Sequence, residues 1–105
     1  MSLQSEVLLF LKSLKPQLVS VGIKNIGLFG SISKNKFTKN SDIDIVYETT
    51  NKFIEQYKGW SAFTYLNKNL REKVSNKFNI DVDMFDLNSS SNIKDKIKKE
   101  ALYVW

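Results

Sequence analysis

The amino-acid sequence predicts a single α/β domain, of the α+β type, in which helices alternate with short strands. Three observations support this prediction. The chain has 105 residues, the length of one domain. Apolar residues recur every three or four positions in some segments, as on a helix, and alternate with polar residues in others, as in a strand. With 42% apolar and 12% aromatic residues, the chain can bury a hydrophobic core.

The first predicted element is a helix whose apolar stripe begins at Leu3. We expect this helix to end at Leu14 or Lys15, because the residue before a proline is pushed out of the helical region. Pro16 can then open a second, short helical turn over residues 17–21. The N-terminal segment is therefore predicted to contain a broken helix.

The remaining elements follow from the same patterns. Residues 24–29 read as a short buried strand, and residues 49–59 as an irregular connection. Apolar residues spaced by three and four predict a long amphipathic helix over residues 60–77. A serine-rich turn precedes a basic helix over residues 93–99, and residues 101–105 are expected to end the chain as a short strand.

The composition restricts the chemistry that the protein can perform. The chain has no Cys and no His, which excludes disulfides, thiolate nucleophiles, Cys/His zinc sites and a histidine general base. A metal ion would be held by oxygen ligands, and these suit magnesium, manganese or calcium. Magnesium is the ion that we expect.

The charge and hydropathy of the chain indicate whether it binds nucleic acid or a membrane. The net charge of +5 suggests nucleic acid, but the lysines are spread along the chain and Arg71 is its one arginine. A solvated basic surface is therefore favoured over a nucleic-acid interface. The longest apolar run covers residues 7–11, too short for a membrane span, and the N-terminus lacks a secretory signal. We expect a cytoplasmic protein with no membrane partner.

Five of the eleven acidic residues fall in two predicted strands, at 41–47 and 79–87. They are Asp42, Asp44, Asp81, Asp83 and Asp86. Because side chains alternate along a strand, Asp42 and Asp44 point the same way, about 6 to 7 Å apart, while Ile43 and Ile45 point into the core. The pattern predicts carboxylates held on a rigid element.

A turn with the properties of a phosphate site precedes these acids. Gly30 follows the buried strand and lets the backbone approach a ligand, and Ser31 offers a hydroxyl and an amide. A helical turn starting here would direct its positive end at phosphate. Opposite it, Asp42 and Asp44 could hold divalent ions that bridge the same phosphates.

At these residues the sequence resembles a known family. Residues 28–31 (LFGS) followed by residues 41–45 (SDIDI) are similar to the signature of the minimal nucleotidyltransferases of the polymerase-beta-like superfamily, and the likeness covers nearly the whole chain. The resemblance implies one domain over 1–105, a small mixed β-sheet flanked by helices. It also implies that the glycine-serine turn holds a nucleoside triphosphate and that two aspartates and a third acid bind magnesium.

The resemblance assigns roles to the residues of this chain that occupy the positions of the family's motifs. Asp42 and Asp44 match the two metal-binding aspartates, and Asp83 matches the third acid. Asp81 remains the alternative because it shares a strand face with Asp83, whereas Asp86 falls on the other face. The predicted nucleotide contacts are Gly30, Ser31, Lys34 and Ser41.

The resemblance implies a magnesium-dependent transfer of AMP from ATP to a hydroxyl. Because 105 residues leave no room for an acceptor-binding domain, we expect another molecule to supply the acceptor. Members of the family often work beside a small helical HEPN-type toxin, and some add AMP to its tyrosine. The sequence thus predicts an antitoxin-like adenylyltransferase in a homo- or hetero-oligomer. A non-catalytic antitoxin module and an RNA-end-modifying enzyme remain alternatives.

Overall fold

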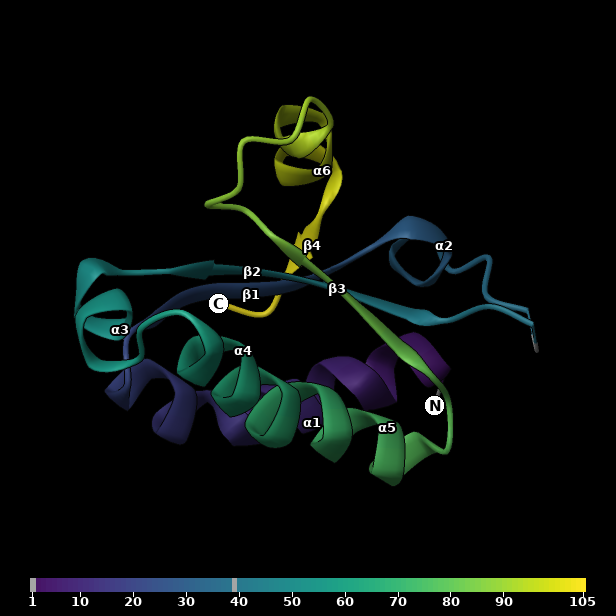
Figure 1. Cartoon of the computed structure of the whole chain (residues 1–105). Coiled ribbons are helices and arrows are strands. Elements are labelled where there is room, and N and C mark those ends of the chain that lie inside the picture. Colours follow the sequence, from purple (N-terminus) through teal and green to yellow (C-terminus); the bar gives the residue numbers. More distant parts are fainter. Residues whose placement is uncertain (1, 39) are drawn as a thin grey trace.

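A four-stranded mixed β-sheet forms the centre of the computed structural model, which describes residues 2–38 and 40–105 (Figure 1). The strands are β1 (Ile23–Phe29), β2 (Ile43–Thr49), β3 (Val82–Asp86) and β4 (Leu102–Tyr103), in the spatial order β3-β2-β1-β4. Strand β1 runs antiparallel to β2 and β4, and β3 runs parallel to β2. The predicted mixed sheet flanked by helices is confirmed.

One face of the sheet is covered by helices (Figure 1). They are α1 (Leu3–Ser20), α4 (Trp60–Leu66) and α5 (Glu72–Phe78), with the π-helical turn η1 (Asn67–Arg71) joining the last two. Helix α6 (Lys94–Glu100) lies over the opposite face, and the short helix α2 (Gly30–Ser33) follows directly on β1. The two faces of the sheet are therefore unequal, and one is largely free of helices.

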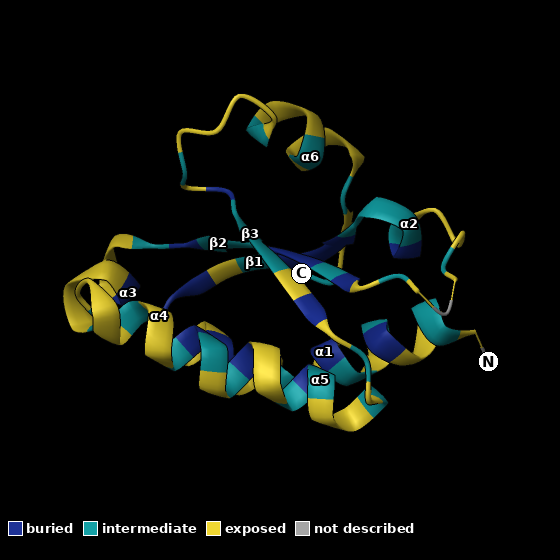
Figure 2. Ribbon diagram, turned by 45° about the vertical axis from the view of Figure 1, so that its right-hand side comes forward, coloured by how far each residue is buried: buried dark blue, intermediate teal, exposed yellow. Residues whose placement is uncertain are grey.

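The hydrophobic core lies between the sheet and the covering helices (Figure 2). Leu11 and Leu18 of α1, Ile45 of β2 and Leu70 and Val74 of the helical span are almost fully buried there. Because β2 alternates, its two acidic residues are turned to the other face. None of the helices in residues 2–38 and 40–105 is long and apolar enough to cross a membrane.

Helix α1 differs from its prediction, because it continues through Pro16 to Ser20. The predicted break at Leu14 or Lys15 is wrong. Leu18, two residues beyond the proline, is completely buried, so packing of the last turn outweighs the local preference against helix before proline. Pro16 itself is exposed, and its ring faces solvent rather than the core.

Replacing this proline tests the cost of the interruption. Pro16→Ala restores a backbone N–H that can donate to the Lys12 carbonyl, and alanine is the best helix former. We expect the free energy of unfolding to rise by about 1 to 3 kcal/mol, measured by urea denaturation. Lys15→Ala, an exposed neighbour, is the control and should change it by less than about 0.5 kcal/mol. If the Pro16→Ala protein were no more stable than its parent, Pro16 would not destabilise helix α1.

The connection after β2 also differs. Residues 49–59 were predicted to be irregular, but β2 extends to Thr49 and α3 covers Asn51–Gln56. Two contacts hold this helix in place: the Thr50 hydroxyl donates to the Gly22 carbonyl at 2.8 Å, and Phe53 is buried in the core. A helix of 6 residues is too short to show a clear apolar period in the sequence.

The long amphipathic helix predicted over residues 60–77 is confirmed over Trp60–Phe78, with one irregularity in its middle. The π-helical turn η1 lies between Leu66 and Val74, which are buried together with Leu70. These residues are spaced by four, slightly more than the 3.6 residues of an α-helical turn. The wider π turn keeps all three facing the core.

Candidate active site

Two aspartates meet on the face of the sheet that the long helices leave open. In the parallel pairing of β2 with β3, Asp44 lies opposite Asp83, and in the antiparallel pairing of β2 with β1 it lies opposite Phe29. Neighbouring strands are about 4.8 Å apart, so the two carboxyl groups are close neighbours. Ile43 and Ile45 face the core, as predicted, which turns Asp44 to the open face.

Gly30 brings the backbone directly against Asp44. Its φ is +68°, a conformation that residues with a side chain rarely adopt. A Cβ on Gly30 would overlap Oδ2 of Asp44 and lie 3.2 Å from its Cγ. Glycine is therefore required both by the backbone conformation and by the approach to the carboxylate, and α2 begins at this residue.

The surroundings change the protonation of Asp44. Burial, followed by the charges of Asp83 and Asp42, raises the pKa of Asp44 to about 6. The two neighbouring acids are those that the sequence grouped with it. The structure thus brings Asp42, Asp44 and Asp83 into electrostatic contact.

Asp42 and Asp81 lie just outside the strands. Both are exposed, and they line one hollow of about 270 Å³ together with Ser41 and Asn79. The Asp81 carbonyl accepts a hydrogen bond from the Ile43 N–H at 2.9 Å, so Asp81 helps to join the two strands. Of the two competing acids, Asp83 is the one that faces Asp44.

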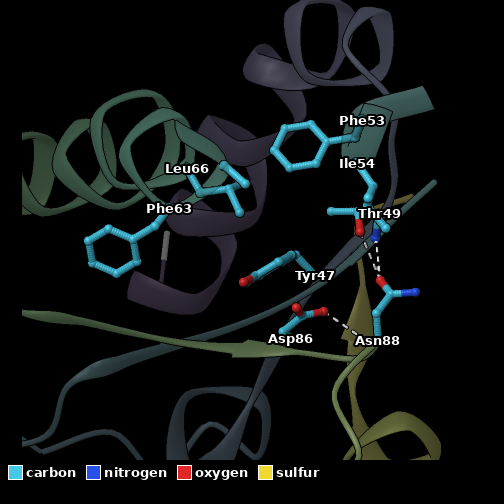
Figure 3. Close-up of a pocket in the computed structure, with 9 residues that line it drawn as sticks. Tyr47, Thr49, Phe53, Ile54, Phe63, Leu66, Asp86 and Asn88 are labelled. Carbon is cyan, nitrogen blue, oxygen red and sulfur yellow. Dashed lines mark hydrogen bonds between the residues drawn. The ribbon is translucent and has the colours of Figure 1, made fainter. Parts of the chain in front are cut away.

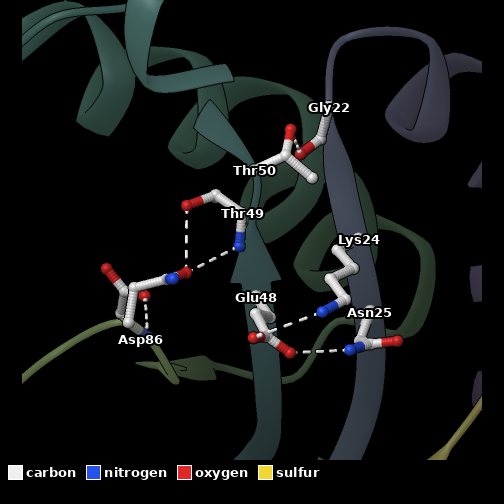
Figure 4. A network of polar contacts seen from close by, with 8 residues as sticks. Gly22, Lys24, Asn25, Glu48, Thr49, Thr50 and Asp86 are labelled. Carbon is white, nitrogen blue, oxygen red and sulfur yellow. Dashed lines mark hydrogen bonds and ion pairs between the residues drawn. The ribbon is translucent and has the colours of Figure 1, made fainter. Parts of the chain in front are cut away.

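Asp86 points to the other face of the sheet, as its position in the strand predicted (Figure 3). One of its carboxylate oxygens accepts a hydrogen bond from the Asn88 N–H at 2.8 Å. The Asn88 side chain in turn accepts hydrogen bonds from the N–H and the hydroxyl of Thr49, at 2.7 and 3.0 Å (Figure 4). Asp86 therefore belongs to the turn after β3 and not to the open face.

The predicted nucleotide contacts differ in what they do in the structure. Ser31 is half-buried in α2, and its carbonyl accepts the N–H groups of Lys34 and Lys36. Lys34 is exposed at the end of α2. Ser41 closes a turn, since its hydroxyl accepts the Thr38 N–H at 3.2 Å and lies 3.0 Å from the Thr38 hydroxyl. Gly30 is the one whose backbone lies directly against the Asp44 carboxylate.

Two phenylalanines lie on the same face and were not proposed from the sequence as site residues. Phe29 and Phe85 meet edge to face with their ring centroids 6.1 Å apart. Phe29 is the register partner of Asp44, and Phe85 lies two residues beyond Asp83 on the same face of β3. The available signal was the alternation that places Phe85 beside Asp83.

Known proteins resemble this chain over most of its length. Residues 12–104 match the family described as "Polymerase beta, Nucleotidyltransferase". The chain belongs to this family. It is therefore a nucleotidyltransferase, as the sequence resemblance implied.

A curated relative of this nucleotidyltransferase is the Methanocaldococcus jannaschii protein named "Putative protein adenylyltransferase MJ0126". It is 31% identical over 84 residues, which cover 78% of this chain and 76% of the relative. A solved structure described as "Crystal structure of the toxin-antitoxin with AMP-PNP" matches with a TM-score of 0.63 at 24% identity, covering 90% of this chain and 72% of its own.

A second solved structure, described as a "putative nucleotidyltransferase from Sulfolobus solfataricus", has a TM-score of 0.50 and 20% identity. The match covers 97% of this chain and 82% of the other. At these identities the two solved structures show that the fold is shared. They agree with the mixed sheet and covering helices described above.

The donor atoms of the nucleotidyltransferase fit magnesium in type and in charge. In the described part of the chain, no three carboxylates are close enough to hold a metal ion by themselves. Magnesium commonly takes only one or two carboxylates and completes its ligands with water and substrate phosphates. The pair of Asp44 and Asp83 fits this use, because a cation between them would offset the charge of Asp83, which adds to burial in raising the pKa of Asp44.

The raised pKa of Asp44 predicts how stability depends on pH. The folded chain holds this proton more tightly than the unfolded chain, so the cost of ionising Asp44 is absent below pH 3.8 and fully present above about 6. We expect the free energy of unfolding of the metal-free protein to fall over this window relative to that of Asp44→Asn. Urea denaturation of both proteins at a series of pH values measures the difference. Parallel curves would contradict the assigned pKa.

Proposed function

We propose that this nucleotidyltransferase transfers AMP from ATP, with magnesium, to a tyrosine hydroxyl of a small helical HEPN-type toxin, and so acts as its antitoxin in the cytoplasm. The observation that carries the proposal is the placement of Asp44 opposite Asp83, with the Gly30 turn against the carboxylate. A backbone turn that admits phosphate and a pair of carboxylates are the two parts that nucleotidyl transfer requires.

In this proposal each residue has a distinct role. Gly30 and Ser31 position the triphosphate through backbone amides, and Lys34 meets it as a point charge. One or two magnesium ions, each held by no more than two of the carboxylates of Asp42, Asp44 and Asp83 and completed by water and substrate, would neutralise charge on the phosphates and the leaving group. A carboxylate oxygen of Asp83 accepts the proton of the acceptor hydroxyl. The hydroxyl oxygen bonds to the α-phosphorus, and the bond to pyrophosphate breaks.

The proposed reaction forms no covalent intermediate between the nucleotide and the protein. The chain has no Cys and no His, and the open face carries carboxylates rather than a nucleophile held beside a base. The rate must therefore come from placement and electrostatics, as in other phosphoryl and nucleotidyl transfers. This favours direct transfer from ATP to the acceptor over a route through an adenylylated enzyme.

A protein acceptor is supported by two comparisons. The relative from Methanocaldococcus jannaschii is named for protein adenylylation, and the fold is shared with a structure described as a toxin-antitoxin with AMP-PNP. Phe29 and Phe85, the aromatic side chains beside Asp44 and Asp83, carry no hydroxyl, which favours an acceptor tyrosine supplied by another molecule. A partner protein that approaches this face can supply it.

The test incubates the protein with α-labelled ATP, magnesium and the candidate HEPN-type protein encoded beside it. We expect label on the partner, lost when its candidate tyrosine is changed to phenylalanine. A tight complex without label would support the non-catalytic antitoxin module instead. Label on added RNA would support the RNA-end-modifying enzyme. Omitting magnesium, or adding a chelator, should prevent labelling.

A further inference from the structure

Exposed aromatic side chains gather on the helical side of the molecule, away from the carboxylates. Trp60 is 78% exposed and Phe63 is 51% exposed, although both are large and apolar. Their rings stack with centroids 5.0 Å apart and an interplanar angle of 26°. Large apolar side chains exposed side by side usually mark an interaction surface. We call this stacked pair on α4 the aromatic ridge.

A hollow with a negative charge lies on one side of the ridge (Figure 3). Its volume is about 410 Å³, and Phe63 and Leu66 of α4 and Ile54 of α3 form apolar walls. Asp86 and the Tyr47 hydroxyl are its polar groups that face α4 across the cavity. No Lys or Arg is among the described residues that line this hollow.

A hollow with positive charges lies on the other side of the ridge. It has a volume of about 650 Å³ and is lined by Trp60, Tyr65, Lys58 and Lys68. No Asp or Glu is among the described residues that line it. The two hollows follow opposite sides of α4, because Phe63 and Leu66 line the first and Trp60 and Lys68 line the second.

We propose that the aromatic ridge and its two hollows are the docking site for an amphipathic helix of a partner protein. The helix lays an apolar stripe on Trp60 and Phe63, with basic side chains along one edge reaching Asp86 and acidic side chains along the other reaching Lys58 and Lys68. An apolar ridge with charges of opposite sign on its two sides matches a helix that carries the inverse charges along the edges of its apolar stripe.

The same charges argue against other occupants. Nucleic acid would stack on Trp60 and meet Lys58 and Lys68, but its phosphates would also face the Asp86 carboxylate. A second copy of this chain carries the same net charge of +5, and the resulting repulsion opposes self-association. The site is also independent of catalysis, because Asp86 and Asp83 point to opposite faces of the sheet.

The test uses a capped helical peptide of about 15 residues, with a leucine stripe between an arginine edge and a glutamate edge. Two control peptides carry glutamate on both edges or arginine on both edges. A peptide helix can bind the ridge in either direction, and reversal exchanges the sides on which its two charged edges lie. One of the two directions therefore always brings the arginine edge to Asp86. In NMR titrations of the isotope-labelled full chain, we expect saturable shifts around Phe63 and Asn88. Each control peptide should bind at least about fivefold more weakly.

Variants assign this binding to the ridge. Trp60→Ala should weaken binding of the mixed peptide by at least about tenfold, without harm to the fold because the side chain is exposed. Asp86→Asn should bring the affinity for the all-glutamate peptide up to that for the mixed peptide. Lys58→Glu should do the same for the all-arginine peptide. Leu9→Ala, which removes a 60% exposed apolar side chain from α1, is the matched control and should leave binding unchanged.

Three results would overturn the proposal. The first is the absence of saturable shifts with the mixed peptide, or equal affinity for all three peptides. The second is a short oligouridylate that shifts the same residues and binds more tightly than the peptide. The third is self-association in sedimentation experiments that Trp60→Ala abolishes, which would make a second copy the occupant.

Discussion

Asp44→Asn should reduce AMP transfer by at least about a hundredfold while making the metal-free protein more stable. Asparagine keeps the size and shape of the side chain but removes the charge that faces Asp83. In the proposed mechanism, the loss of charge would weaken the hold on magnesium and, through it, on the nucleotide. It also removes the cost of ionising a half-exposed carboxyl whose pKa is raised to about 6. After allowance for solvent screening, the gain in stability should be about 1 kcal/mol.

Two measurements on the same protein separate these effects. Transfer is followed with labelled ATP, and stability by urea denaturation in the presence of a chelator. Glu72→Gln removes one negative charge from an exposed site on α5 and is the control, expected to preserve both quantities. An Asp44→Asn protein that transfers AMP at the parent rate would show that the metal is held elsewhere.

The same assay decides which acid is the third ligand. Asp83 faces Asp44 in the sheet, whereas Asp81 lies before β3 in the hollow that Asp42 lines. Loss of transfer in Asp83→Asn with retention in Asp81→Asn is the result that this geometry predicts. The reverse pattern would assign the third ligand to Asp81, and the register of the two strands would then be a poor guide to the site.

Much of the candidate site follows from local rules of strand geometry. The direction of the Asp44 and Asp83 side chains can be predicted without the fold. Their apolar neighbours must be buried, so the aspartates point to the opposite face of the strand. Gly30 also stands out locally, since it directly follows a buried strand. The pairing of Asp44 with Asp83 requires the parallel register of β2 and β3, which two separate segments of sequence do not contain. The family resemblance supplied that step.

The features that were missed depend on packing between distant segments. Helix α1 continues past Pro16 because Leu18 is buried, and α3 forms because Phe53 enters the core. Local propensity alone predicts a break at the first position and irregular structure at the second. The exposure of Trp60 and Phe63 could not be predicted either, since both fit the apolar period of the helix over residues 60–77, and that period alone does not distinguish a buried face from an exposed one. Their exposure emerges only from the position of α4 on the sheet.

Gly30→Ala should abolish nucleotide binding and transfer, because the glycine serves two purposes that alanine cannot. The added Cβ would overlap the Asp44 carboxylate, and the φ of +68° is unfavourable for a residue with a side chain. Relief of the overlap requires Asp44 to turn away or the start of α2 to move. Either movement separates the turn that we propose to bind phosphate from the carboxylates. We expect transfer to fall at least about a hundredfold, since small displacements of positioning groups have effects of this size.

Gly59→Ala is a matched control for this substitution. Gly59 also has a positive φ, +55°, but a Cβ there meets no atom within 4 Å. It should therefore lose about 1 kcal/mol of stability from the backbone conformation alone, with transfer unchanged. Gly30→Ala should lose more stability than this, and the thermal shift caused by magnesium and ATP should disappear. If the two variants lost equal stability and Gly30→Ala kept its activity, the approach of the turn to Asp44 would have no part in catalysis.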